Sequence, residues 1–220
     1  MQKILPFLLS LLLLTACGQN PAQARADYDL AMKYMRGAGV PQDSSRGITY
    51  LQRAADEGST DAQLTLGFLY LKGTGVPKDA AKALDLFLQA GQQGNRDAQY
   101  NAGLMYVRGE GAKADFAKAA EWFEKAALQD DPGAQFNMGV MTMNGEGVTR
   151  DLLTAYAWFS LADEKGFAGA KAEMAKAKSA MTSDQTGYLG RTIAELKKRV
   201  QGGSAEKKEA PSAQGQNQPL

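Results

Sequence analysis

The chain has 220 residues, a formal net charge of +1 and 22% charged residues. It contains no histidine and a single cysteine, which excludes serine–histidine–aspartate and cysteine–histidine catalysis, most zinc sites and any internal disulfide. Nucleic-acid binding requires a basic excess, and the balanced charge provides none, so we expect no nucleic-acid partner.

Residues 1–16 are predicted to be a signal peptide. A basic start at Lys3 is followed by an apolar run of 11 residues, Ile4 to Leu14, which is shorter than the ~20 residues of a membrane-spanning helix. The run ends in Leu14-Thr15-Ala16-Cys17, which resembles the lipobox of bacterial lipoproteins. The resemblance implies cleavage before Cys17 and acylation of that cysteine, with residues 17–23 as the lipidated end and a short tether.

Acylation of Cys17 would anchor the protein to a membrane without a membrane-spanning helix. Each buried methylene contributes ~0.8 kcal/mol, so two or more acyl chains hold a protein stably. In lipoproteins an aspartate after the cysteine favours the inner membrane, whereas this chain has Gly18. We therefore expect an outer-membrane lipoprotein that faces the periplasm. The alternative is an ordinary secretory signal with an incidental cysteine.

The rest of the chain repeats itself every 36 residues. The segment "YLKGTGVPKD" at 70–79 has counterparts at 34–43, 106–115 and 142–151. Two further features keep the same spacing: Asp-Ala-Gln at 61–63 and 97–99 returns as Gly-Ala-Gln at 133–135, and a glycine recurs at 67, 103 and 139. A fixed period of this length indicates an architecture of stacked repeats.

Each repeat is predicted to contain two helices, near 61–72 and near 80–92 in the second copy. Gly67 would cost its helix ~1 kcal/mol, so its recurrence predicts close helix crossing. The Gly-x-Gly pair could bind phosphate, but no strand precedes it and no third glycine or Gly-Lys-Ser/Thr follows. The pair is better explained by a helix end at Gly73, followed by an N-cap at Asp79.

These features resemble Sel1-like repeats, relatives of the tetratricopeptide repeat. The shared motifs are the Ala-Gln start, the mid-helix glycine, the Y-x-x-G-x-G-V loop and the A-x-x-W-F-x-x-A second helix. The resemblance implies an all-α fold, an α-solenoid of about four and a half repeats over 24–201. A helix near 184–200 would cap the stack. Residues 202–220 lack aromatic residues, are rich in Gly, Ser, Gln and Pro, and are predicted to be disordered.

The first helices of the repeats carry the candidate partner-binding residues. In tetratricopeptide relatives these helices line the concave face. The equivalent positions form three apolar ladders and one basic ladder: Tyr28, Leu64, Tyr100 and Phe136; Met32, Phe68, Leu104 and Val140; Met35, Leu71, Val107 and Met143; and Arg36, Lys72 and Arg108, which ends in Asn144. The alternatives are packing between successive helices for the apolar ladders and a solvated edge for the basic one.

The sequence favours an envelope-anchored scaffold or adaptor that binds a protein or peptide, and not an enzyme. We expect no catalytic residue, no metal and no small-molecule cofactor. The carboxylate pairs Glu110/Glu146 and Asp130-Asp131 are interpreted as solvated turn residues. The alternative functions are cell-wall glycan binding or carbohydrate-directed catalysis, since aromatic ladders also stack sugars, and the stabilisation of a larger secretion or division complex.

Overall fold

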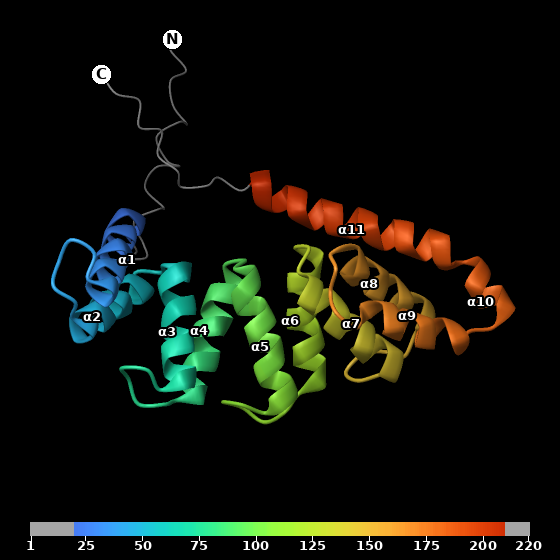
Figure 1. The fold of residues 1–220 in the computed structure, drawn as a ribbon, viewed down its shortest axis with the longest axis horizontal. Helices are drawn as coiled ribbons and strands as arrows, with labels where there is room; N and C mark the ends of the chain where they lie inside the picture. Colours follow the sequence, from blue (N-terminus) through green and yellow to red (C-terminus); the bar gives the residue numbers. More distant parts are fainter. Residues whose placement is uncertain (1–19, 210–220) are drawn as a thin grey trace, which may run out of the picture. The chain divides into compact units, whose positions relative to one another are not determined.

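The computed structural model describes residues 20–209, and all the regular secondary structure in that range is helical (Figure 1). The chain divides into two compact units at Lys78–Asp79, inside the second repeat. Unit 1 contains α1 (Pro21–Arg36), α2 (Ser44–Asp56) and α3 (Thr60–Lys72). Unit 2 contains α4 (Ala80–Gln92), α5 (Arg96–Arg108), α6 (Phe116–Leu128), α7 (Pro132–Asn144), α8 (Leu152–Glu164), α9 (Ala170–Ser179), α10 (Ser183–Gly187) and α11 (Leu189–Glu209). The predicted all-α solenoid fold is confirmed.

The predicted loop chemistry is confirmed in all four copies. Each odd-numbered helix from α1 to α7 ends at a left-handed glycine, whose N–H donates to the carbonyl four residues earlier: Gly37, Gly73, Gly109 and Gly145. Each following helix begins after an aspartate whose carboxylate accepts a backbone N–H of the first turn: Asp43, Asp79, Asp115 and Asp151. The N–H of Lys118 lowers the pKa of Asp115 for this reason.

The mid-helix glycines lie under aromatic rings, as the close-crossing prediction required. A Cβ added to Gly103 would lie 2.7 Å from the ring of Phe123 on α6. The same atom on Gly139 would lie 2.5 Å from the ring of Phe159 on α8. Both phenylalanines are fully buried, so the paired helices of a repeat approach each other through a glycine-and-ring contact.

The second glycine of the loop has a separate role in the third and fourth repeats, which is to let the loop approach the preceding repeat closely. A Cβ on Gly111 would lie 2.3 Å from the carbonyl oxygen of Ala80, at the start of α4. A Cβ on Gly147 would lie 2.2 Å from the carbonyl oxygen of Phe116, at the start of α6. Unit 2 therefore stacks its repeats through direct contact between a loop glycine and helix backbone.

The C-terminal helices extend farther than predicted. The predicted capping helix is present as α10 and α11, and α11 packs along α8 and α6 through buried Leu196 and Val200 (Figure 1). Helix α11 also continues to Glu209, beyond the predicted end of the solenoid at residue 201. The continuation is accompanied by a contact with another helix, because a Cβ on Gly203 would lie 3.0 Å from the carbonyl oxygen of Leu128. The glycine permits close packing on α6 instead of ending the helix.

The first helix also begins earlier than the predicted start of the solenoid at residue 24. Helix α1 begins at Pro21, so residues 21–23 are helical instead of part of the tether. Asn20 caps the helix through its side chain, and proline occupies the first turn, where its missing N–H is harmless. The signal peptide, Cys17 and residues 210–220 lie outside the described residues. Between residues 20 and 209, none of the helices has the length and hydropathy needed to cross a membrane.

Candidate functional site

Buried glutamines connect each repeat to the one before it. Gln63, Gln99 and Gln135 occupy equivalent positions in α3, α5 and α7, and all three are buried. Each Nε2 donates to a carbonyl oxygen in the last turn of the preceding helix, at distances of 3.2 Å to Ala55, 2.8 Å to Gly91 and 3.3 Å to Ala127. Each of these carbonyls also accepts the backbone N–H three residues later, so the glutamine adds a second hydrogen bond at the end of the helix.

In the first repeat, which begins with the first described helix, the equivalent residue is Asp27. This aspartate is buried, and its Oδ1 accepts a bond of 3.0 Å from Gln23 Nε2. Its Oδ2 lies 3.3 Å from Arg53 Nη2, an ion pair that lacks the geometry of a hydrogen bond. The carboxylate therefore bonds only within its own repeat.

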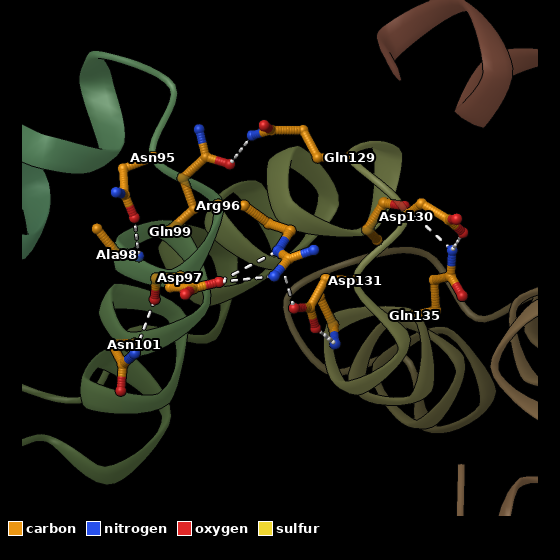
Figure 2. Close-up of polar contacts among 12 residues, drawn as sticks. Asn95, Arg96, Asp97, Ala98, Gln99, Asn101, Gln129, Asp130, Asp131 and Gln135 are labelled. Carbon is orange, nitrogen blue, oxygen red and sulfur yellow. Dashed lines mark hydrogen bonds and ion pairs between the residues drawn. The ribbon is translucent and has the colours of Figure 1, made fainter. Parts of the chain in front are cut away.

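The hydrogen bonds that surround the buried glutamines differ between the third and fourth repeats (Figure 2). Gln129 Nε2 donates to Gln99 Oε1 at 2.6 Å, so the glutamine on α5 is bonded through both its amide atoms. Lys165 occupies the position equivalent to Gln129 one repeat later, and it pairs with Asp130 Oδ2. Asp130 Oδ1 accepts from Gln135 Nε2 at 3.2 Å, and Gln135 Oε1 is buried without a hydrogen-bond partner.

Asp130 and Asp131 are more than solvated turn residues. Asp130 has a φ of 64°, and it is the one non-glycine residue with positive φ among the residues described. Glycines occupy the equivalent positions 58, 94 and 166. Asp131 caps α7 by accepting the N–H of Ala134, and its Oδ2 lies 3.5 Å from Nε of Arg96, which also contacts Asp97 (Figure 2). The pair thus stabilises the α6–α7 turn.

The aromatic ladder is half-buried and takes part in packing. The ring centroid of Tyr100 lies 5.7 Å from that of Phe123, and a Cβ on Gly133 would lie 3.1 Å from the Tyr100 ring. Phe136 lies 5.5 Å from Phe159 and 4.9 Å from Phe167, by ring centroids. The rings of Tyr100 and Phe136 therefore contribute to packing between helices, while both side chains stay half-buried.

The other ladders divide into half-buried apolar positions and exposed basic ones. Every residue of the second and third apolar ladders is half-buried, and Arg36, Lys72 and Arg108 are exposed. Each of these cations is the last residue of its helix, where the negative end of the helix dipole favours it. None of the three forms an ion pair with another described residue.

The repeats match a known family model. The Sel1 repeat model matches residues 24–59, 60–95, 96–131 and 132–167, which is most of the described chain. The chain belongs to the Sel1 repeat family. Each match spans one pair of helices, so the family unit is the helix–loop–helix unit described above. Sel1 repeat proteins are generally scaffolds for protein–protein interaction.

Two solved structures support the same fold. A Sel1 repeat protein from Oxalobacter formigenes is 26% identical, with a TM-score of 0.67, over 79% of this chain and 73% of that one. A protective antigen present in uropathogenic Escherichia coli strains, which displays an SLR fold, is 23% identical, with a TM-score of 0.53. That match covers 90% of this chain and half of the antigen. No curated protein sequence matches the chain at a significant level.

The glutamine contacts of these Sel1 repeats were not predicted, although the Ala-Gln motif was. A glutamine that recurs on a buried helix at the period of the repeat is the signal that could have revealed them, because a buried amide needs partners. Residues 20–209 contain no cluster of three or more aspartate, glutamate, cysteine or histidine side chains that could hold a metal ion.

A pair of substitutions tests the strain at Asp130. Asp130→Gly removes the left-handed strain of a side chain, about 1 kcal/mol, but it loses both the ion pair with Lys165 and the hydrogen bond from Gln135 Nε2, which together contribute about 1–2 kcal/mol. Its stability should therefore be equal to that of the parent or up to about 1 kcal/mol lower. Asp130→Ala retains the strain and removes the same two contacts. We expect the alanine variant to be about 1 kcal/mol less stable than the glycine variant in urea denaturation. Equal stability of the two variants would show that the backbone is relaxed there.

Proposed function

We propose that this Sel1 repeat protein is an envelope-anchored adaptor, which holds a protein or peptide on the face formed by its first helices. The observation that supports the binding face is the recurrence of half-buried apolar side chains at equivalent positions of α5 and α7 within unit 2, and of α1 and α3 within unit 1. A repeat fold needs a buried core, but it does not need apolar side chains on its accessible edge. Such a face suits an extended peptide or an amphipathic helix.

The second ladder is the better candidate for the contact itself. Tyr100 and Phe136 already pack against rings of the neighbouring helices, so their substitution would also disturb folding. Leu104 and Val140 lie one helical turn farther along α5 and α7 and are likewise half-buried. The exposed Arg108 beside them favours a partner with an acidic residue next to its apolar ones.

The anchoring part of the proposal rests on the lipobox-like segment that ends in Cys17. Acylation there would place the repeats at a membrane surface, and Gly18 after the cysteine favours the outer membrane. Mass spectrometry of the protein extracted from membranes tests this part directly. Acylated Cys17 is the expected result, and a free N-terminal cysteine or an uncut leader would contradict it.

Glycan binding is less favoured, because sugar stacking requires an exposed aromatic face. Within the described residues the large hydrophobic side chains that are well exposed are Phe116, at the start of α6, and Tyr188, between α10 and α11. The rings of Tyr100 and Phe136 in the predicted aromatic ladder pack against other rings. Saturable binding to purified peptidoglycan would reverse this preference.

The binding face is tested by cross-linking the full-length protein in its own membrane and identifying the partners. Combined Leu104→Ser and Val140→Ser substitutions should reduce recovery of a specific partner by about tenfold or more, since truncating each apolar side chain at an interface weakens binding by about 1 kcal/mol. Leu88→Ser is the matched control, because Leu88 is a half-buried leucine on α4, a second helix of its repeat. Equal recovery with the double variant would refute the face.

A further inference from the structure

The first repeat has a stacking surface that no other repeat among residues 20–209 covers. We call this surface the leading face and define it by Ala26, Leu30, Gly39 and Tyr50. Ala26 is exposed, whereas its equivalents Ala62, Ala98 and Ala134 have no exposed surface. Leu30 and Tyr50 are half-buried, whereas their equivalents in the third and fourth repeats are buried: Ala102 and Met138, and Trp122 and Trp158.

Contacts inside unit 2 show that these positions face the preceding repeat. Trp122 lies against the end of α4, since a Cβ on Gly91 would lie 2.9 Å from its ring. Gly111 lies against the start of α4, at Ala80. Their equivalents in the first repeat are Tyr50 and Gly39, and a Cβ on Gly39 would meet no atom within 4 Å. The leading face is thus equivalent to surfaces that contact the preceding repeat in unit 2.

Arginine and tyrosine side chains line this surface. Tyr34 stacks on Tyr50 with ring centroids 5.8 Å apart, Arg46 Cζ lies 5.7 Å from the Tyr34 ring, and Arg53 Cζ lies 5.5 Å from the Tyr50 ring. Both guanidinium groups are more than half exposed, although each also has a carboxylate partner, Asp43 or the buried Asp27. Tyrosine and arginine are the side chains that favour a membrane interface, and guanidinium groups bind phosphate.

The chain before α1 is very short if it starts at a lipidated Cys17. Only Gly18 and Gln19 separate that cysteine from Asn20, the cap of α1. The Asn20 N–H donates to Glu57 Oε2 at 2.8 Å, which fixes the entry of the chain beside the end of α2. Three Cα–Cα steps span at most ~11 Å. Ala26 lies six residues farther, about 9 Å along the helix.

From these observations we propose that the leading face of the first repeat rests on the phosphate headgroups of the membrane that holds Cys17. The proposal depends on the anchoring proposed above. The lipid surface takes the place of a preceding repeat: headgroup phosphates bind Arg46 and Arg53, and the apolar parts of Tyr50, Leu30 and Ala26 are removed from water. The unmated surface is then covered without a second protein.

Paramagnetic relaxation of alanine methyl groups tests the contact. The chain from Cys17 onward, which contains every described residue, is coupled through the Cys17 thiol to a maleimide phospholipid in nanodiscs of phosphatidylethanolamine and phosphatidylglycerol that carry a gadolinium-labelled lipid. Ala26 and Ala172, an exposed alanine of α9, are compared. We expect several-fold stronger relaxation at Ala26. Equal relaxation of the two methyl groups would overturn the proposal. Because the lipid is attached chemically, the result does not depend on natural acylation.

Two controls separate docking from mere tethering. A Gly-Ser insert of about ten residues after Gly18 behaves as a flexible coil and lengthens the tether. The relaxation at Ala26 should remain stronger than at Ala172 with this insert. If the difference in relaxation disappears, the short tether alone created the proximity. Tyr50→Ser should weaken the effect, and Tyr188→Ser, at an exposed tyrosine that also has an arginine beside it, should not. A chain that instead forms dimers, with Ala26 protected from the labelled lipid, would assign the face to a second copy and reject the membrane.

Discussion

Replacing Gly147 by alanine should lower the free energy of unfolding by more than about 3 kcal/mol, a loss in the range of severe backbone disruptions. The residue has a φ of +70°, and its added Cβ would lie 2.2 Å from the carbonyl oxygen and 2.6 Å from the next backbone nitrogen at the start of α6. Backbone atoms cannot rotate away as a side chain can. The third and fourth repeats must therefore separate to admit the methyl group.

Gly166 provides the matched control for that substitution. It lies in the same repeat with a φ of +74°, and an added Cβ would meet no atom within 4 Å. Gly166→Ala should cost only the left-handed backbone penalty, about 1–2 kcal/mol. Urea denaturation, followed by the fluorescence of Trp122 and Trp158, measures both losses. Similar losses for the two variants would show that the stacking contact at Gly147 is not tight.

This contrast shows which features of the fold are visible in the sequence. The ends of each helix depend on residues nearby in the chain, so Gly73 and Asp79 could be assigned from their types and spacing. The role of Gly147 depends on the preceding repeat, because the atoms that exclude a side chain belong to Phe116 and Ala117. The recurrence of the second glycine was visible in the sequence, but its cause was not.

The C-terminal boundary was misplaced for a similar reason. Composition assigned residues 202–220 to a disordered tail, since a segment without aromatic residues and rich in Gly, Ser, Gln and Pro offers little surface to bury. In the structure residues 202–209 continue α11, whose preceding turns hold Leu196 and Val200 against the neighbouring helices. Ion pairs from Lys197 to Glu164 and from Arg199 to Glu124 add to this contact. A helix already docked along two others can extend beyond what its own composition would support.

The sequence predicted which positions form the candidate binding face. It did not predict which of their side chains also pack against neighbouring helices. A 36-residue period shows which residues are equivalent, and the half-buried state of all three apolar ladders agrees with that assignment. The period does not show that Phe136 turns toward Phe159 and Phe167, because Phe167 follows the fourth pair of helices and has no aromatic counterpart in the earlier repeats. Residues that differ from the repeat pattern, such as Phe167, influence how the rings are oriented locally.

The two buried glutamines of unit 2 lead to the second large expected effect. Gln99→Leu should lower stability by about 2 kcal/mol, because it removes two hydrogen bonds of the Gln99 amide: one to the buried Gly91 carbonyl, which keeps its bond from the Gly94 N–H, and one from Gln129 Nε2. Gln135→Leu should cost about 1 kcal/mol, because its bond to the Ala127 carbonyl is longer, at 3.3 Å, and the substitution also removes a buried oxygen that has no partner.

Both variants replace a buried glutamine by leucine at equivalent positions. The difference in transfer free energy between the two side chains therefore largely cancels when the variants are compared. Stability is measured in urea, and Gln129→Ala is added to determine how much of the Gln99→Leu loss arises from the bond at Gln129 Nε2. An equal or greater loss for Gln135→Leu would mean that Gln135 Oε1 is satisfied in solution, with Lys165 as the nearest cation in the network. The fourth repeat would then be bound to the third as strongly as the third is to the second.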